Sequence, residues 1–177
     1  MMKHLIVMRH GKAEKDSASG EDYERNLMQR GVREAATVAE ALKSRGLKPD
    51  YALVSAAHRT HQTFEAVKSI LSDILGDIPG EVREDMFNMG ADDLRRLIEG
   101  HEEAGECLLV VGHNPGIQYL VLDYMVQGAA SQVEIDRVRS GYPTATATVF
   151  DVDAAGRPLF NDLLKPKDLA DDLAGGE

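Results

Sequence analysis

The sequence predicts an α/β protein: a three-layer sandwich with a mostly parallel central sheet flanked by helices and an antiparallel edge near the C-terminus. Short apolar runs typical of buried strands alternate along the chain with segments of helical periodicity, and this alternation is the pattern of parallel sheets. The last two strand-like segments follow each other without a helix between them. That succession places an antiparallel edge at this end of the sheet.

The N-terminal half is expected to form strand, helix, strand and helix in turn. A continuous apolar run at 5–8 indicates a buried strand, and apolar residues at helical spacing in 32–42, followed by Gly46, indicate a helix and its end. A second buried strand is expected at 51–54. The next helix is marked by its apolar positions and by the turn-forming residues after it, which are Phe64, Val67, Ile70, Leu71, Ile74, Gly76 and Pro79.

The C-terminal half continues the alternation and then departs from it. A short helix is expected at 92–98, a fully apolar strand at 107–111 and a helix at 117–126. Threonine alternates with alanine or valine at 144–152, as in a half-exposed strand, and 159–163 is expected to form the last edge strand.

Length and composition bound the class of protein. The chain has 177 residues, of which 43% are hydrophobic and 28% charged, an ordinary globular balance that excludes collagen, coiled coil and full-length disorder. We expect a single domain over 1–166, followed by a frayed acidic tail at 167–177.

The charge balance limits the partners. With 20 Lys and Arg against 30 Asp and Glu, the formal net charge is -10, so neither nucleic acid nor an anionic membrane is an expected partner. The first apolar run is too short for a signal-peptide core, and no window resembles a membrane helix. Cys107 is the single cysteine, which excludes an intrachain disulfide and a Cys-rich zinc site. A cytoplasmic location is expected.

Polar residues follow three of the predicted strands. The first strand ends in Arg9-His10-Gly11, the second is followed by Arg59, and the third by His113 and Asn114. In open α/β sheets, ligands bind outside the carboxyl ends of the strands. If these strands are parallel neighbours, two guanidinium groups and two imidazoles converge on one crevice.

Such a cluster of positive and imidazole groups predicts an anionic ligand. Arginine forks match phosphate oxygens in a bidentate manner, so a phosphoryl group is the natural ligand. Asn114 is expected to cap a helix whose N–H groups point toward the pocket, and Gly11 allows the backbone to approach a ligand closely. The segment 22–27, which precedes the first helix, could carry Arg25 over the same pocket.

Each of these residues also has a plainer interpretation. A lone histidine after a strand is more often packed or exposed than catalytic, and His58 and His61 are expected to be exposed on a helix. The sequence has no metal-binding spacing of His-x-His, Glu-x-x-His or Cys-x-x-Cys type, and no P-loop or Gly-x-Gly-x-x-Gly pattern. It is the ordered occurrence of the three segments that favours function.

Taken together, these segments resemble the histidine phosphatase superfamily, also called phosphoglycerate mutase-like. Arg9-His10-Gly11 matches its Arg-His-Gly signature, and residues 55–63 match its Ser-x-x-x-Arg-x-x-Gln-Thr segment. Residues 111–116 match the segment of its second histidine. Residues 22–31 resemble the Asp-x-x-Arg-Pro-Leu-x-x-x-Gly stretch of the short SixA-type branch, which contains phosphohistidine phosphatases; Asn26 stands where that branch usually has proline, a change expected to have little effect.

The resemblance implies a metal-independent phosphatase without a cofactor. It implies that His10 is the nucleophile and forms a phosphohistidine intermediate that water cleaves, with Arg9, Arg59 and His113 completing the catalytic set. The residues expected to bind substrate are Arg25, Gly11 and Asn114. The implied partner is a phosphorylated protein or a small-molecule phosphate.

The alternatives are a small-molecule phosphomonoesterase of the same superfamily, a non-enzymatic module that binds a phospho-ligand, and a metal-dependent hydrolase. The wider superfamily uses a carboxylic acid to protonate the leaving group, whereas SixA-type members lack a clear equivalent. Glu84 and Asp85 are the candidates for that acid, with solvated charges as the competing interpretation.

Overall fold

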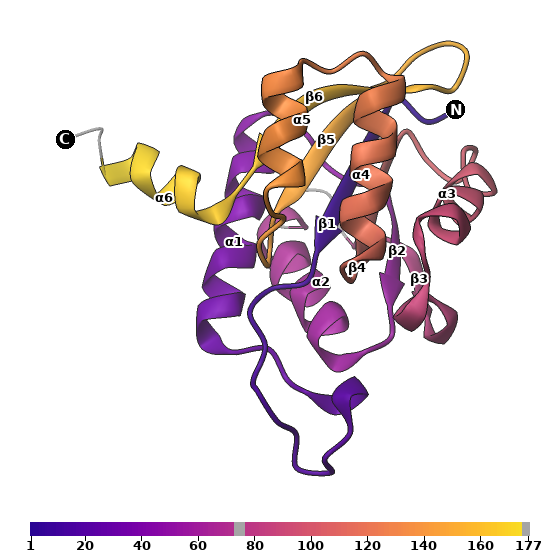
Figure 1. Ribbon diagram of the computed structural model, residues 1–177. Helices are drawn as coiled ribbons and strands as arrows, with labels where there is room; N and C mark the ends of the chain where they lie inside the picture. Colours follow the sequence, from indigo (N-terminus) through magenta and orange to yellow (C-terminus); the bar gives the residue numbers. More distant parts are fainter. Residues whose placement is uncertain (73–76, 175–177) are drawn as a thin grey trace.

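Figure 1 shows the computed structural model of the chain, in which residues 1–72 and 77–174 are described. Six strands form one sheet in the order β3-β2-β4-β1-β5-β6. The first four of these are parallel to one another, while β5 runs antiparallel to β1 and β6 antiparallel to β5. The predicted fold class, including its antiparallel C-terminal edge, is confirmed. The strands are β1 (His4–Arg9), β2 (Tyr51–Ser55), β3 (Gly80–Arg83), β4 (Cys107–Gly112), β5 (Ala147–Val152) and β6 (Pro158–Leu164).

Helices cover both faces of the sheet, because successive side chains of a strand point to opposite faces. Ile6 and Met8 join the core beneath two helices, and Leu5 and Val7 join the core on the other face. One layer holds α1 (Gln29–Ser44) and α2 (His58–Leu71), with α6 (Pro166–Ala174) packed against α1. The other layer holds α3 (Ala91–Glu99), α4 (Gly116–Gln127) and α5 (Gln132–Arg139). Ile74 and Gly76, which contributed to the predicted second helix, lie outside the described residues.

Among the strands and α-helices, β3, α5 and α6 escaped prediction. The edge strand β3 has the sequence Gly-Glu-Val-Arg, which carries one apolar residue and so lacks a strand signature. The strand can pair with β2 because residue 80 is a glycine. Its backbone lies so close to Ala52 that a Cβ at this position would clash with the Ala52 backbone. The helix α5 did have a sequence signature, the pattern Ser-x-x-Glu, and Ser131 caps the helix by accepting a hydrogen bond from the Glu134 amide.

The C-terminal segment differs from the expectation of a frayed tail. Residues from Pro166 to Ala174 form the helix α6. Two tertiary contacts stabilise it: Leu169 packs against the core on the α1 face, and Asp168 pairs with Arg137 at 3.0 Å. Neither contact is local in sequence, so neither could be predicted from it; residues 175–177, the end of the predicted tail, lie outside the described residues.

The strand predicted at 144–152 begins three residues later, at Ala147. Ala145 adopts a φ of +62° in a turn, which an extended strand cannot include. The Ala145 amide donates to the carbonyl oxygen of His10 at 2.9 Å, so this turn is fastened to the end of β1.

The topology brings the three polar strand ends together. In the sheet, β4 lies between β2 and β1, and all three are parallel, so their carboxyl ends share one edge. The loop between β1 and α1 extends from the same edge, at the bottom of Figure 1. Among the described residues, no helix combines the length and the apolar character needed to cross a membrane.

Candidate active site

Side chains from these strand ends form one compact cluster. The imidazole rings of His10 and His113 lie with their centroids 5.3 Å apart and tilted by 56°. Arg9 and Arg59 are close enough to both rings to lower the pKa of each imidazole, and Arg25 acts on His10 as well. The structure therefore brings together the five charged and imidazole side chains that the sequence placed around a phosphoryl site.

His10 is held in one orientation by the backbone around it. Its side chain is buried, with 6% of the residue exposed, and its Nδ1 lies 2.7 Å from the carbonyl oxygen of Gly11. A carbonyl oxygen can only accept, so Nδ1 carries the proton and donates it. In the neutral ring, Nε2 is then the nitrogen with a free lone pair.

The surroundings of His10 favour the neutral ring. Burial and the positive charges of Arg59, Arg9 and Arg25, opposed by the Gly11 hydrogen bond, together lower the pKa of His10 from 6.5 to about 4. A neutral imidazole at physiological pH retains the lone pair that nucleophilic attack requires.

His113 is fixed by a neighbouring strand and by an aromatic ring. Its Nε2 lies 2.8 Å from the hydroxyl oxygen of Ser55, at the end of β2. The Phe87 ring packs edge-on against the imidazole, with centroids 5.4 Å apart. Burial, assisted by His10 and Arg59, lowers the pKa of His113 to about 3. Its Nδ1 is buried and has no hydrogen-bond partner among the described residues.

The carbonyl oxygen of Tyr142 positions two further candidates. It accepts from Arg9 Nη1 at 2.9 Å and from Asn114 Nδ2 at 3.1 Å. The expectation that Asn114 caps the following helix is wrong: α4 begins at Gly116 with Pro115 as its capping residue, and the Asn114 amide is engaged by Tyr142 instead. Sequence spacing alone could not reveal this distant acceptor.

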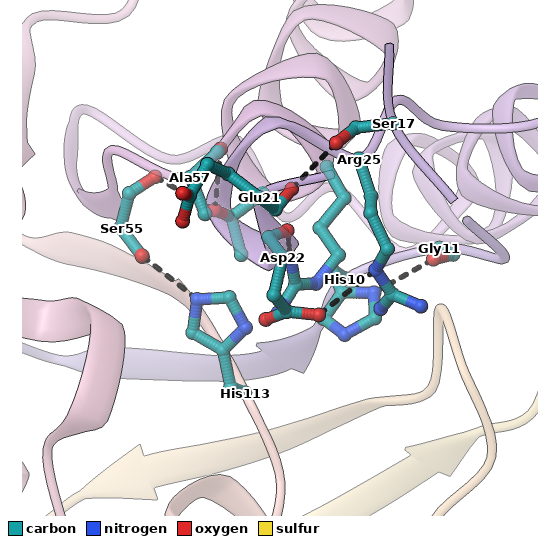
Figure 2. Close-up of polar contacts among 11 residues, drawn as sticks. His10, Gly11, Ser17, Glu21, Asp22, Arg25, Ser55, Ala57 and His113 are labelled. Atoms are coloured by element: carbon teal, nitrogen blue, oxygen red, sulfur yellow. Dashed lines mark hydrogen bonds and ion pairs between the residues drawn. The ribbon is translucent and has the colours of Figure 1, made fainter. Parts of the chain in front are cut away.

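The two remaining arginines are linked by one carboxylate that the sequence analysis did not single out. Asp22 lies in a short 3-10 helix, η1 (Asp22–Glu24). Its carboxylate pairs with Arg59 Nη2 at 3.1 Å and with Arg25 Nε at 3.0 Å. Figure 2 shows this carboxylate projecting over the space between the two imidazole rings.

Besides Arg59, the segment 55–63 contains two polar residues that hold the loop between β1 and α1 in place. Thr63 Oγ1 accepts from the Gly11 amide at 2.9 Å, which ties the loop after β1 to α2. Gln62 Oε1 accepts from the Leu27 amide at 2.7 Å, and Gln62 Nε2 donates to Asn26 Oδ1 at 3.0 Å. Asn26 therefore helps to fasten the loop that carries Arg25, although its side chain differs from the proline usual in the branch.

The candidate leaving-group acids lie on a second 3-10 helix, η2 (Glu84–Asn88), and both are exposed. Arg83 donates two hydrogen bonds to the Asp85 carboxylate, from Nε at 3.0 Å and from Nη2 at 2.8 Å. These bonds lower the pKa of that carboxyl. A carboxylate held in this way favours its ionised form and is poorly suited to donating a proton.

The two histidines of α2 are not part of the cluster formed by His10, His113 and the arginines. His58 and His61 are exposed, as predicted. Across residues 1–72 and 77–174, no group of three or more histidine, cysteine, aspartate or glutamate side chains is arranged to hold a metal ion.

The lowered pKa values predict that acid weakens the fold. The unfolded chain binds a proton at each of these histidines below about pH 6.5, whereas the folded chain excludes it until about 4 for His10 and about 3 for His113. Unfolding therefore takes up protons, and the free energy of unfolding falls by about 1 kcal/mol per pH unit and per histidine between about pH 6.5 and pH 5.

Urea denaturation across this pH range measures the effect. The double substitution His10→Gln and His113→Gln removes both ionisable rings, so we expect a shallower pH dependence in the double variant than in the wild type. Equal slopes in the two proteins would contradict the assignment.

Comparison with known proteins agrees with the site. The sequence profile of the histidine phosphatase superfamily (branch 1) matches residues 5–89, which include His10, Arg25 and Arg59. An uncharacterized chloroplastic protein of Arabidopsis thaliana is 29% identical over 123 residues, or 64% of this chain. The match spans only 55% of that longer curated relative.

Solved structures match over almost the whole chain. A SixA structure from Agrobacterium tumefaciens is 25% identical with a TM-score of 0.78, covering 94% of this chain and 100% of the other. The protein histidine phosphatase SixA complexed with tungstate is 26% identical with a TM-score of 0.73, covering 94% and 99%. The α-ribazole phosphatase of Shigella flexneri, at 14% identity and a TM-score of 0.64, covers 92% and 96% and shares the fold. The sequence profile and the solved structures therefore agree that this chain is similar to the histidine phosphatase superfamily, and to its SixA-type branch in particular.

Proposed function

We propose that this chain is a metal-independent phosphatase that acts on a phosphohistidine of a protein through a phosphohistidine intermediate on His10. The observation that carries the proposal is the state of His10: a buried, neutral imidazole whose Nδ1 is committed to the Gly11 carbonyl, next to three arginines. The resemblance to a protein histidine phosphatase SixA supports the substrate class.

In the first step, the lone pair on His10 Nε2 attacks phosphorus in line with the leaving group. A P–N bond forms as the bond to the leaving group breaks, and Nδ1 keeps its proton on the Gly11 carbonyl throughout. In the second step, water attacks phosphorus: a P–O bond forms as the P–N bond breaks, the electron pair of that bond returns to His10 Nε2, and the proton that the water loses passes to the released phosphate or to solvent. Each step transfers a phosphoryl group, so catalysis depends mainly on position and charge.

The arginines and His113 are suited to bind the non-bridging oxygens. The Nε atoms of Arg9 and Arg59 are buried and have no hydrogen-bond partner among the described residues, and the same is true of His113 Nδ1. Buried donors of this kind stabilise negative charge strongly, because little water competes for them. In this proposal Asn114 and the Gly11 backbone line the same pocket, with Arg25 above it. Tungstate, bound by a SixA relative, is a tetrahedral oxyanion like phosphate.

Leaving-group chemistry favours phosphohistidine over an alkyl ester. An imidazole can take a proton from water near neutral pH and depart neutral, whereas an alkoxide depends on a placed acid, often for about 10²–10⁴ in rate. The carboxylate of Asp85 is held ionised by Arg83, and Glu84 is exposed. Neither carboxyl is buried beside the two histidines.

We therefore predict that phosphohistidine and aryl phosphates are hydrolysed well and alkyl phosphates poorly. Glu84→Gln and Asp85→Asn should change phosphohistidine hydrolysis less than about threefold, because neither group is expected to transfer the proton. Steady-state rates on the three substrate classes measure both expectations. Loss of hydrolysis of phosphohistidine and aryl phosphate alike in either variant would identify a general acid and remove the reason for the preference.

The experiment that tests the proposed function is rapid-quench trapping of the intermediate. With a radiolabelled phosphohistidine protein and excess chelator, label should appear on the peptide that contains His10, as an acid-labile and alkali-stable bond. An acid-stable adduct on serine, or no adduct from an active enzyme, would refute the intermediate. Loss of activity in the chelator would favour a metal-dependent hydrolase.

A further inference from the structure

The carboxylate of Asp22 lies against two guanidinium groups that a phosphoryl group would contact. It accepts a hydrogen bond from Arg59 Nη2 and forms an ion pair with Arg25, whose Nε has no hydrogen-bond partner among the described residues. Its two oxygens pair with Arg59 Nη2 and Arg25 Nε, at 3.1 and 3.0 Å. The backbone carbonyl oxygen of the same residue accepts from Arg59 Nη1 at 2.8 Å. Two nitrogens of one guanidinium are thus engaged by Asp22, one through its backbone and one through its side chain.

The charge balance makes this carboxylate a competitor of phosphate. His10 and His113 are neutral, so Arg9, Arg25 and Arg59 supply the positive charge of the pocket. When a phosphate dianion binds, the Asp22 carboxylate must either leave the two guanidiniums or remain beside a second anion. Both outcomes lower the affinity for phosphate. If the carboxylate leaves, its two ion pairs with the arginines are lost, and if it stays, it repels the phosphate.

The position of Asp22 allows the exchange. Its side chain is 61% exposed, and η1 lies in the loop outside the sheet, so the carboxylate can turn into solvent without disturbing the core. The backbone contact to Arg59 does not depend on the side chain. It can keep the guanidinium directed into the pocket while the carboxylate moves away.

We propose that Asp22 is a placeholder for the phosphoryl group: it neutralises Arg25 and Arg59 in the free enzyme and weakens the binding of inorganic phosphate, which promotes product release. The proposal rests on the proposed function, since it takes the arginine cluster to be the phosphate site. Two parts of Asp22 thus have opposite effects on phosphate affinity. The backbone carbonyl positions Arg59 for binding, and the side chain competes with phosphate for the arginines.

Calorimetric titration with inorganic phosphate tests the proposal. Asp22→Asn keeps the size of the side chain and the backbone contact but removes the charge, so phosphate should bind about tenfold more tightly than to the wild type. The matched control is Glu24→Gln, which removes one exposed carboxylate from the same short helix and should leave the affinity within about twofold. Unchanged or weaker binding by Asp22→Asn would overturn the proposal, and so would equal tightening by Glu24→Gln.

Two further variants separate the possible failures. Arg59→Ala should weaken phosphate binding strongly; if it does not, the pocket itself is misassigned and the proposed function fails with it. If Arg59→Ala weakens binding but Asp22→Asn does not tighten it, only the placeholder role fails. Thermal unfolding checks that each variant is folded, and Asp22→Ser, which also removes the carboxylate, replaces Asp22→Asn if the latter is not.

Discussion

Replacement of His10 with alanine is expected to lower turnover by on the order of 10⁴ to 10⁶, because it removes the nucleophile. The arginines and His113 that surround the nucleophile stabilise charge but cannot attack phosphorus. The remaining pocket still offers Arg9, Arg59 and His113 to the substrate, so His10→Ala should continue to bind phosphate. The measurement is kcat for an aryl phosphate, together with calorimetric titration of inorganic phosphate.

The matched control is His61→Ala, which removes an exposed histidine from α2 at a distance from the chemistry. It should retain turnover within about twofold, as surface substitutions usually do. Residual turnover above about one hundredth of the wild-type rate in folded His10→Ala would exclude His10 as the nucleophile.

The second largest effect is expected at Arg59. The residue is 6% exposed and its guanidinium lies 5.7 Å from the Phe87 ring centroid, so its charge acts in a partly desolvated site. Loss of one such donor costs about 10²–10³ in rate, and Arg59→Ala should lose about that factor in kcat/KM. Arg59→Lys should recover little, because an ammonium group cannot reproduce the planar fork that also reaches Asp22.

Arg30→Ala is the matched control for this arginine. Arg30 is exposed on α1 and pairs with Glu34 at 2.6 Å, so its removal should leave kcat/KM within about twofold. A loss smaller than about tenfold in Arg59→Ala, with the fold intact, would place Arg59 outside the transition-state site.

Local periodicity predicted five of the six strands of the sheet and the segments that carry the site. Continuous apolar runs at β1, β2 and β4 require burial on both faces of a sheet, and the helices between them require parallel strands. Parallel neighbours end at one edge, so the prediction that His10, Arg59 and His113 lie together depended on the three strands being neighbours, and the structure shows that they are. These inferences succeeded because they depend on local periodicity and on topology.

How that site is held depends on contacts that form only in the folded chain. Ser55 orients His113, Thr63 ties Gly11 to α2, and Gln62 fastens the loop that carries Arg25. In the sequence these three polar residues belong to one motif, but their partners lie far away along the chain, in the loop between β1 and α1 and in the segment after β4. Nothing in local spacing specifies which polar groups will meet.

The same physical reason explains the elements and the residue that prediction missed. β3 forms because Gly80 can approach the backbone of Ala52, and α6 forms because Leu169 finds an apolar surface on the α1 face. Asp22 looks like an ordinary loop carboxylate until the fold places Arg25 and Arg59 on either side of it. Local propensity sets which segments can become helix or strand. Contacts between residues distant in the chain decide which weak segments become ordered, and which charges share a pocket.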